Sequence, residues 1–101
     1  MHGLHYTPLA KQDLSNIVSY IASDLHSPAA ARKLLNAIEA KVKHLQQFPY
    51  AYSLYRSQKP LQDEFRRMSV GNYLVLYVVE DSTVEIRRVL YGGRDIGVHL
   101  D

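Results

Sequence analysis

Apolar residues recur at helical spacing in the first half of the chain and at strand spacing in the second half. One apolar stripe predicts an amphipathic helix that begins at Thr7 and the proline after it and ends near residues 24–26. A second stripe predicts another helix, begun by Ser27 and its following proline and stopped by Pro49. Two such helices joined by a few residues predict an antiparallel hairpin. The first stripe consists of Leu14, Ile17, Val18, Ile21 and Leu25, and the second of Leu34, Leu35, Ile38, Val42, Leu45 and Phe48.

Strands are expected in the sequence both before and after the helical hairpin. Residues 73–79 are apolar on both faces, which is typical of a central strand. The order β-α-α-β-β-β predicts an α+β fold, a single domain over residues 1–101, in which the N-terminal helical hairpin packs on one face of an antiparallel sheet. The opposite face is left for solvent or function. The expected strands are 4–6, 64–70, 73–79 and 84–91, with turns at 71–72 and 80–83 and an irregular segment at 50–61.

Composition excludes several kinds of protein. The 101 residues include no cysteine, which excludes a disulfide framework, a thiolate zinc site and a thiol nucleophile. A formal net charge of +2 argues against a basic coat that binds nucleic acid indiscriminately. The longest apolar run has seven residues, far short of the roughly 20 that cross a membrane. We therefore expect a cytoplasmic protein without a membrane partner, and no motif indicates a metal or a cofactor.

Every basic residue after Lys59 is an arginine, and this pattern suggests a site. On strict strand alternation, Arg87 shares a side with Glu85, Val89 and Tyr91, while Arg88 shares the other with Val84, Ile86 and Leu90. The face without helices would then gather one arginine from each of two strands, which is suited to a phosphodiester because the guanidinium fork matches phosphate oxygens. The alternative is that Glu80, Asp81 and Glu85 neutralise these arginines on a solvated surface. The arginines in question are Arg66, Arg67, Arg87, Arg88 and Arg94.

One histidine could add acid–base chemistry to such a site. His99 lies close to the expected strand ends, and an imidazole titrates near neutral pH. The alternative is a tail histidine without a role. With no cysteine and no metal-ligand cluster, any catalysis would depend on arginine, histidine and tyrosine side chains.

Four stretches of the chain, in the same order, resemble the RelE/ParE superfamily of toxins. The first helix carries Ala10-x-x-Asp13-Leu14-x-x-Ile17, and the second begins Pro28-x-Ala30-Ala31. The central strand Gly71-Asn72-Tyr73-Leu-Val-Leu-Tyr77 is similar to the family's G-x-Y-R-L-x-Y pattern, and Val89-Leu90-Tyr91-Gly92-Gly93-Arg94-Asp95 resembles its closing motif. The long helical hairpin is closer to the ParE side.

The resemblance implies a growth-inhibiting toxin of a type II toxin–antitoxin module, of the kind linked to plasmid stabilization. It implies a tight complex with a cognate antitoxin, with hetero-oligomeric assembly left open, and operator DNA would be contacted by the antitoxin alone. ParE-like members poison DNA gyrase, whereas RelE-like members are metal-free mRNA interferases that cut messenger RNA on the ribosome. A third alternative is a non-toxic module of the same fold that only binds an antitoxin.

Carried over by position, the resemblance places RelE-like catalytic roles at Arg67 and Arg94. Two positions depart from that pattern: Leu74 stands where the family has a phosphate-binding arginine, and Leu100 falls near its C-terminal tyrosine. His99 or Tyr91 would have to replace that tyrosine. Loss of one charge donor at a transition state costs about 10²–10³ in rate. The sequence therefore favours gyrase inhibition, and Arg66, Arg87 and Arg88 stay as candidates for binding phosphate or a partner.

Overall fold

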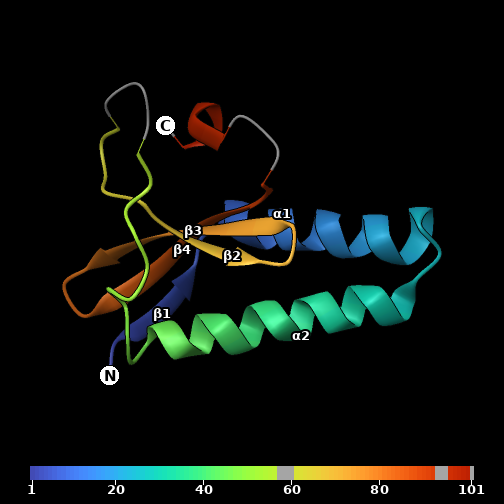
Figure 1. The fold of residues 1–101 in the computed structure, drawn as a ribbon, viewed down its shortest axis with the longest axis horizontal. Coiled ribbons are helices and arrows are strands. Elements are labelled where there is room, and N and C mark those ends of the chain that lie inside the picture. The colour runs from blue at the N-terminus through green and yellow to red at the C-terminus, as the bar shows by residue number, and fades with distance from the viewer. Residues whose placement is uncertain (57–60, 93–95, 101) are drawn as a thin grey trace.

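The computed structural model describes residues 1–56, 61–92 and 96–100 and contains a helical hairpin and a four-stranded sheet (Figure 1). A short first strand leads directly into the hairpin, and the other three strands follow it along the chain. A single π-helical turn, Tyr20–Asp24, extends the first helix, and a 3₁₀ turn, Ile96–His99, follows the last strand. The elements are β1 Gly3–Tyr6, α1 Pro8–Ser19, α2 Pro28–Leu45, β2 Arg66–Val70, β3 Tyr73–Glu80 and β4 Thr83–Tyr91.

The sheet has the order β1-β4-β3-β2. The predicted α+β fold with a hairpin on one face is confirmed, and the strands β2, β3 and β4 form the expected antiparallel meander. The antiparallel prediction is wrong for β1, which pairs parallel to β4, so the sheet is mixed. The helical hairpin and two strands lie between β1 and β4 in the sequence, so no tight turn joins the two strands. A connection of this length allows them to pair in either a parallel or an antiparallel direction.

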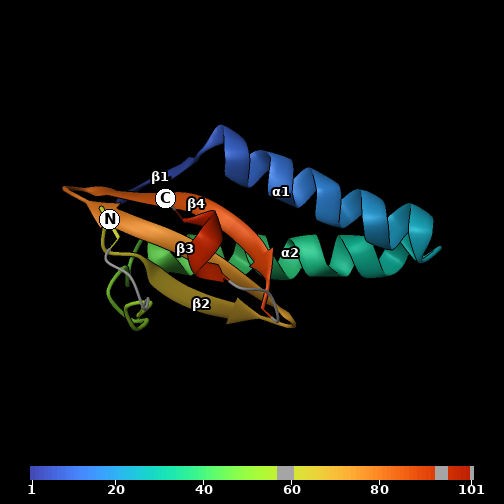
Figure 2. The same ribbon diagram turned by 90° about the horizontal axis from the view of Figure 1, so that it is seen from above.

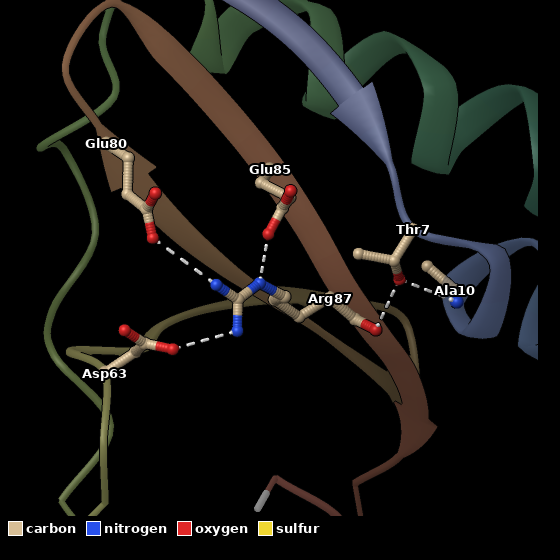
Figure 3. A network of polar contacts seen from close by, with 6 residues as sticks. All are labelled: Thr7, Ala10, Asp63, Glu80, Glu85 and Arg87. Atoms are coloured by element: carbon tan, nitrogen blue, oxygen red, sulfur yellow. Dashed lines mark hydrogen bonds and ion pairs between the residues drawn. The ribbon is translucent and has the colours of Figure 1, made fainter.

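Thr7 begins α1 as predicted and also attaches it to the sheet. Its Oγ1 accepts a hydrogen bond from the backbone N–H of Ala10 at 3.1 Å, which caps the helix. The same hydroxyl donates to the carbonyl of Arg87 at 3.1 Å (Figure 3). Ser27, the corresponding residue before α2, makes no side-chain capping bond.

Both helices end earlier than their apolar stripes suggest. The α-helical hydrogen bonding of α1 ends at Ser19, and the π-helical turn that follows changes the phase, so that Leu25 is 55% exposed. Helix α2 ends at Leu45, three residues before Phe48, whose side chain is 52% exposed. Pro49 is buried and accepts a 2.9 Å hydrogen bond from the hydroxyl of Tyr77.

The sheet carries apolar residues on both faces, which corrects the expectation of an open face. Under the hairpin, β-strand side chains pack with Ala10 of α1 and with the inner face of α2. On the other face, the 3₁₀ turn and the segment before β2 cover a second cluster, and Figures 1 and 2 show that turn on the side of the sheet away from α2. The second cluster consists of Phe65, Leu74, Leu76, Val78, Leu90, Ile96 and Leu100.

A β-bulge in β4 reverses the predicted facing of its last residues. The register shifts between Leu76 and Tyr77 of β3, so that β4 has one extra residue at Arg87. Ile86 and Val89 therefore pack in the same cluster under the hairpin, although strict alternation separates them. The prediction that Val89 shares a side with Arg87, and Ile86 with Leu90, was wrong for this reason.

Candidate functional site

Arg88 is held by Asp13 at the junction of β4 and α1. Its Nε and Nη2 donate to the two oxygens of Asp13 at 2.7 and 2.9 Å, and its Nη1 donates to the carbonyl of His99 at 3.1 Å. Both side chains are largely buried, at 15% and 11% exposed. The hydrogen bonds with Asp13 raise the pKa of Arg88, against the effect of burial. Arg88 therefore joins α1, β4 and the 3₁₀ turn. Its guanidinium is engaged in these bonds and is not available to a phosphate.

Arg87 is surrounded by three carboxylates (Figure 3). It donates to Asp63 at 3.1 Å and to Glu80 at 3.4 Å, and its Nε bonds Glu85. Burial works against the charge, but the hydrogen bonds to Glu85 and Asp63 outweigh it and raise the pKa of Arg87. Glu80 and Glu85 thus neutralise Arg87, as the alternative to a phosphate site predicts.

Arg66 contacts the loop that follows α2. Its Nη1 donates to the carbonyl of Tyr52 at 2.7 Å, and its guanidinium lies 5.0 Å from the ring centroid of Tyr50. Arg66 faces Tyr77 across the β2–β3 pair, whereas Arg67 faces Leu76 of the second cluster, so the two lie on opposite faces as predicted.

Arg67 is exposed and lines a hollow of about 290 Å³ at the end of the sheet. Tyr91, from the end of β4, lines the same hollow, together with Asn72 of the β2–β3 turn. The Tyr91 ring is 51% exposed and meets Tyr73 edge to face at 5.7 Å between centroids. Among the candidate catalytic residues that the structure describes, Arg67 and Tyr91 line the same hollow.

His99 lies apart from that pair. It lines a separate hollow of about 260 Å³ with Thr7, Leu9 and the two β4 arginines. Leu74 and Leu100, the two positions that depart from the RelE-like pattern, both belong to the apolar cluster on the face away from the hairpin. Arg94 lies outside the described residues. The register puts Arg67 of β2 and Arg88 of β4 on the same face, both opposite Leu76, as predicted, but Arg88 is held by Asp13 and the two arginines line different hollows.

Asp13 is the important side chain that sequence reasoning did not select. Besides holding Arg88, its Oδ2 accepts the backbone N–H of Val89 at 3.0 Å and so covers part of the β4 edge. Asp13 falls off the apolar stripe of α1, and its place in the motif that resembles the toxin family was the available signal. An acid next to that stripe, opposite an arginine-rich strand, is a pattern that indicates a structural ion pair.

In residues 1–56, 61–92 and 96–100, no three histidine or acidic side chains gather as metal ligands. No helix in the same part of the chain is long and apolar enough to cross a membrane.

Comparison with known proteins identifies the family. A profile of the ParE toxin of the type II toxin–antitoxin system parDE matches residues 4–96. The structure is similar to that of the chromosomal ParDE system from P. aeruginosa, with a TM-score of 0.73 and 25% identity over 90% of this chain and 96% of that one. No curated protein sequence matches the chain.

More distant structures share the fold. The RelB–RelE complex from Methanococcus jannaschii gives a TM-score of 0.54 at 20% identity, over 96% of this chain and 99% of that one. The E. coli DinJ–YafQ complex gives 0.59 at 12% identity, over 92% and 96%. The ParDE structure is more similar than either, in agreement with the predicted ParE side of the superfamily. This chain belongs to the family of ParE toxins of type II toxin–antitoxin systems.

Proposed function

We propose that this toxin inhibits growth by poisoning DNA gyrase in the cytoplasm and that a cognate antitoxin neutralises it. The antitoxin partner is consistent with the similar solved structures, which are toxin–antitoxin systems. The choice of gyrase rests on what the chain has in place of a nuclease site.

The observation that carries the proposal is that Leu74 and Leu100 are both buried in one apolar cluster. Both belong to the apolar cluster that the 3₁₀ turn covers, with Leu74 6% and Leu100 9% exposed. RelE-like cleavage needs an activated 2′-hydroxyl, stabilisation of phosphate charge and protonation of the leaving oxygen. Two of the positions that would supply those groups are instead side chains of a core.

The state of the strand arginines supports the same conclusion. Arg87 and Arg88 are paired with carboxylates, and Arg66 is bonded to the loop after α2. Moving the guanidinium of Arg88 or Arg87 to a phosphate would leave a buried or half-buried acid, Asp13 or Glu85, without that partner, which costs free energy. Arg67 is thus the one predicted phosphate-binding arginine in the described part of the chain whose side chain projects exposed into a hollow.

The hollow around Arg67 and Tyr91 favours one second candidate, a ribosome-dependent mRNA interferase. A guanidinium and a phenol beside the same hollow are able to bind a phosphate and to move a proton. Such an interferase would be a metal-independent enzyme. Its activity would depend on Arg67, whereas gyrase poisoning would not.

The test follows DNA supercoiling and messenger RNA after induction of the toxin. We expect DNA damage signalling with intact transcripts, inhibition of purified gyrase in a supercoiling assay, and both effects in Arg67→Ala as in the parent chain. Arg56→Ala, which removes another exposed arginine, is the matched control. Rapid transcript cleavage at ribosomes that Arg67→Ala abolishes and Arg56→Ala does not would overturn the proposal. Induction without any growth defect would indicate a non-toxic binding module.

A further inference from the structure

The outer edge of β4 is only partly covered. Strand β1 pairs with β4 from Thr83 to Ile86 and then ends, because the chain turns into α1 at Thr7. From Arg87 to Tyr91, β4 has no neighbouring strand on that side among the described residues. Figure 2 shows α1 continuing on the β4 side of the sheet from the point where β1 ends.

Hydrogen bonds identify which backbone groups point outward along this edge. The carbonyl of Arg87 accepts from Thr7, and the N–H of Val89 donates to Asp13. The N–H of Gly92 donates to the carbonyl of Asn72, on the β3 side. Because alternate residues of a strand face the same edge, Tyr91 points outward like Val89. Within the described chain, the carbonyl of Val89 and both backbone groups of Tyr91 have no partner.

A groove follows these backbone groups. It has a volume of about 520 Å³ and separates α1 and its π-helical turn from the ends of β3 and β4. Ile17 and Val89 give it an apolar floor, and Tyr20, half exposed, forms part of its rim. Tyr73 and Tyr91 line the groove as well, with 5.7 Å between their ring centroids, and the pKa of Tyr73 is raised by burial first and then by Tyr91 and Tyr20.

Hydrogen bonds cover parts of the other two sheet edges. On β2, the N–H of Arg67 donates to Ser53 at 3.0 Å, and Lys41 Nζ donates to the carbonyl of Ser69 at 3.0 Å. At the start of β1, His2 exchanges hydrogen bonds with the backbone and side chain of Gln46. The β4 edge differs from both because unpaired backbone groups lie beside an apolar groove.

We propose that the β4 edge from Val89 to Tyr91 accepts a short extended segment of the antitoxin as an added strand. This inference rests on the proposed antitoxin partner but not on the choice of gyrase as target. An extended backbone satisfies the carbonyl of Val89 and both groups of Tyr91, whereas a helix keeps its own backbone groups paired. Alternate side chains of an added strand point to one face, so the segment places an apolar side chain against Ile17 and Tyr20.

Asn16 allows this groove to be blocked without disturbing the core. It lines the groove from the exposed surface of α1, and the one hydrogen bond that its side chain makes among the described residues is an exposed one, from Gln12 at 2.9 Å. Asn16→Trp fills the groove, and Asn36→Trp, on the exposed surface of α2, is the matched control.

The experiment uses the full chain and the full-length protein encoded by the reading frame next to its gene. Hydrogen exchange by NMR should show that this protein protects the Tyr91 amide, while the Val89 amide is already protected in the free toxin. Asn16→Trp should weaken binding at least about tenfold, the loss expected from a few backbone hydrogen bonds, with Asn36→Trp unchanged.

The following results would overturn the inference. They are a complex in which the Tyr91 amide exchanges as in the free toxin, equal affinity of the two tryptophan variants, and absence of binding by the neighbouring protein. Protection of Tyr91 in the free toxin that rises with concentration would also overturn it, in favour of a second copy of this chain. A complex that protects Tyr91 in a toxin that does not inhibit gyrase would uphold the inference and reject the proposed target.

Discussion

Replacement of Asp13 with asparagine removes the charge that holds Arg88 and keeps the size of the side chain. The pair is bidentate, at 2.7 and 2.9 Å, and its two side chains are 15% and 11% exposed. Removing one partner of a buried ion pair costs about 3–5 kcal/mol, because the remaining charge stays in a poorly solvated place. The amide oxygen of asparagine keeps one acceptor, so we expect a loss of about 2 kcal/mol in the free energy of unfolding.

Thermal and urea unfolding, followed by far-ultraviolet circular dichroism, measure this loss. For a domain of this size, about 2 kcal/mol lowers the midpoint of thermal unfolding by roughly 10 °C. The control is Asp24→Asn, an exposed acid in the π-helical turn, which should change stability by less than about 0.5 kcal/mol. Equal stability of the two variants, with an unchanged urea dependence, would refute the reasoning that Asp13 and Arg88 join α1 to the sheet.

Three further changes test other parts of the structure. Burial raises the pKa of Tyr77 from 10.0 to about 12, so the unfolded state loses this proton at lower pH than the folded state. The free energy of unfolding should therefore fall by about 2–3 kcal/mol between pH 10 and 12. Urea titrations should show a smaller fall in Tyr77→Phe. Leu74→Arg puts a charge into the second cluster and should cost about 2–4 kcal/mol in urea unfolding without messenger RNA cleavage, whereas Leu74→Met should cost under about 1.5 kcal/mol. Thr7→Ala loses the cap and the bond to Arg87, about 1–2 kcal/mol by thermal unfolding, and Thr7→Ser keeps both.

The elements with strong local signals were predictable from the sequence. Residues 73–79 are apolar on both faces, and β3 lies at the centre of the meander with both faces buried. Thr7 and the following proline predicted the start of α1, and the hydroxyl of Thr7 caps it. In each place, the residues that determine the element lie next to one another in the chain.

The features that were missed depend on contacts between distant residues. The bulge at Arg87 is fixed by pairing with β3, and it places Val89 on the face opposite to the one that alternation predicts. Phe48 continues the spacing of α2, but the helix has already ended, and Pro49 is held by Tyr77 from the sheet. The cover on the second face comes from a 3₁₀ turn whose four residues have no periodic pattern.

The same long-range contacts explain why Arg87 and Arg88 do not form the phosphate site that the sequence suggested. Counting strand residues treats each guanidinium as free, but Arg88 is bonded to an acid 75 positions earlier and Arg87 to one 24 positions earlier. A guanidinium that joins α1, β4 and the 3₁₀ turn stabilises the fold, and its release for a substrate would loosen all three. Among the four strand arginines that the structure describes, catalysis is therefore to be sought at Arg67, where the exposed side chain is not part of such a junction. Within the described part of the chain, Arg67 is thus the residue at which gyrase poisoning and RNA cleavage predict different results, and Arg67→Ala beside Arg56→Ala, read out by transcript cleavage and DNA supercoiling, tests them.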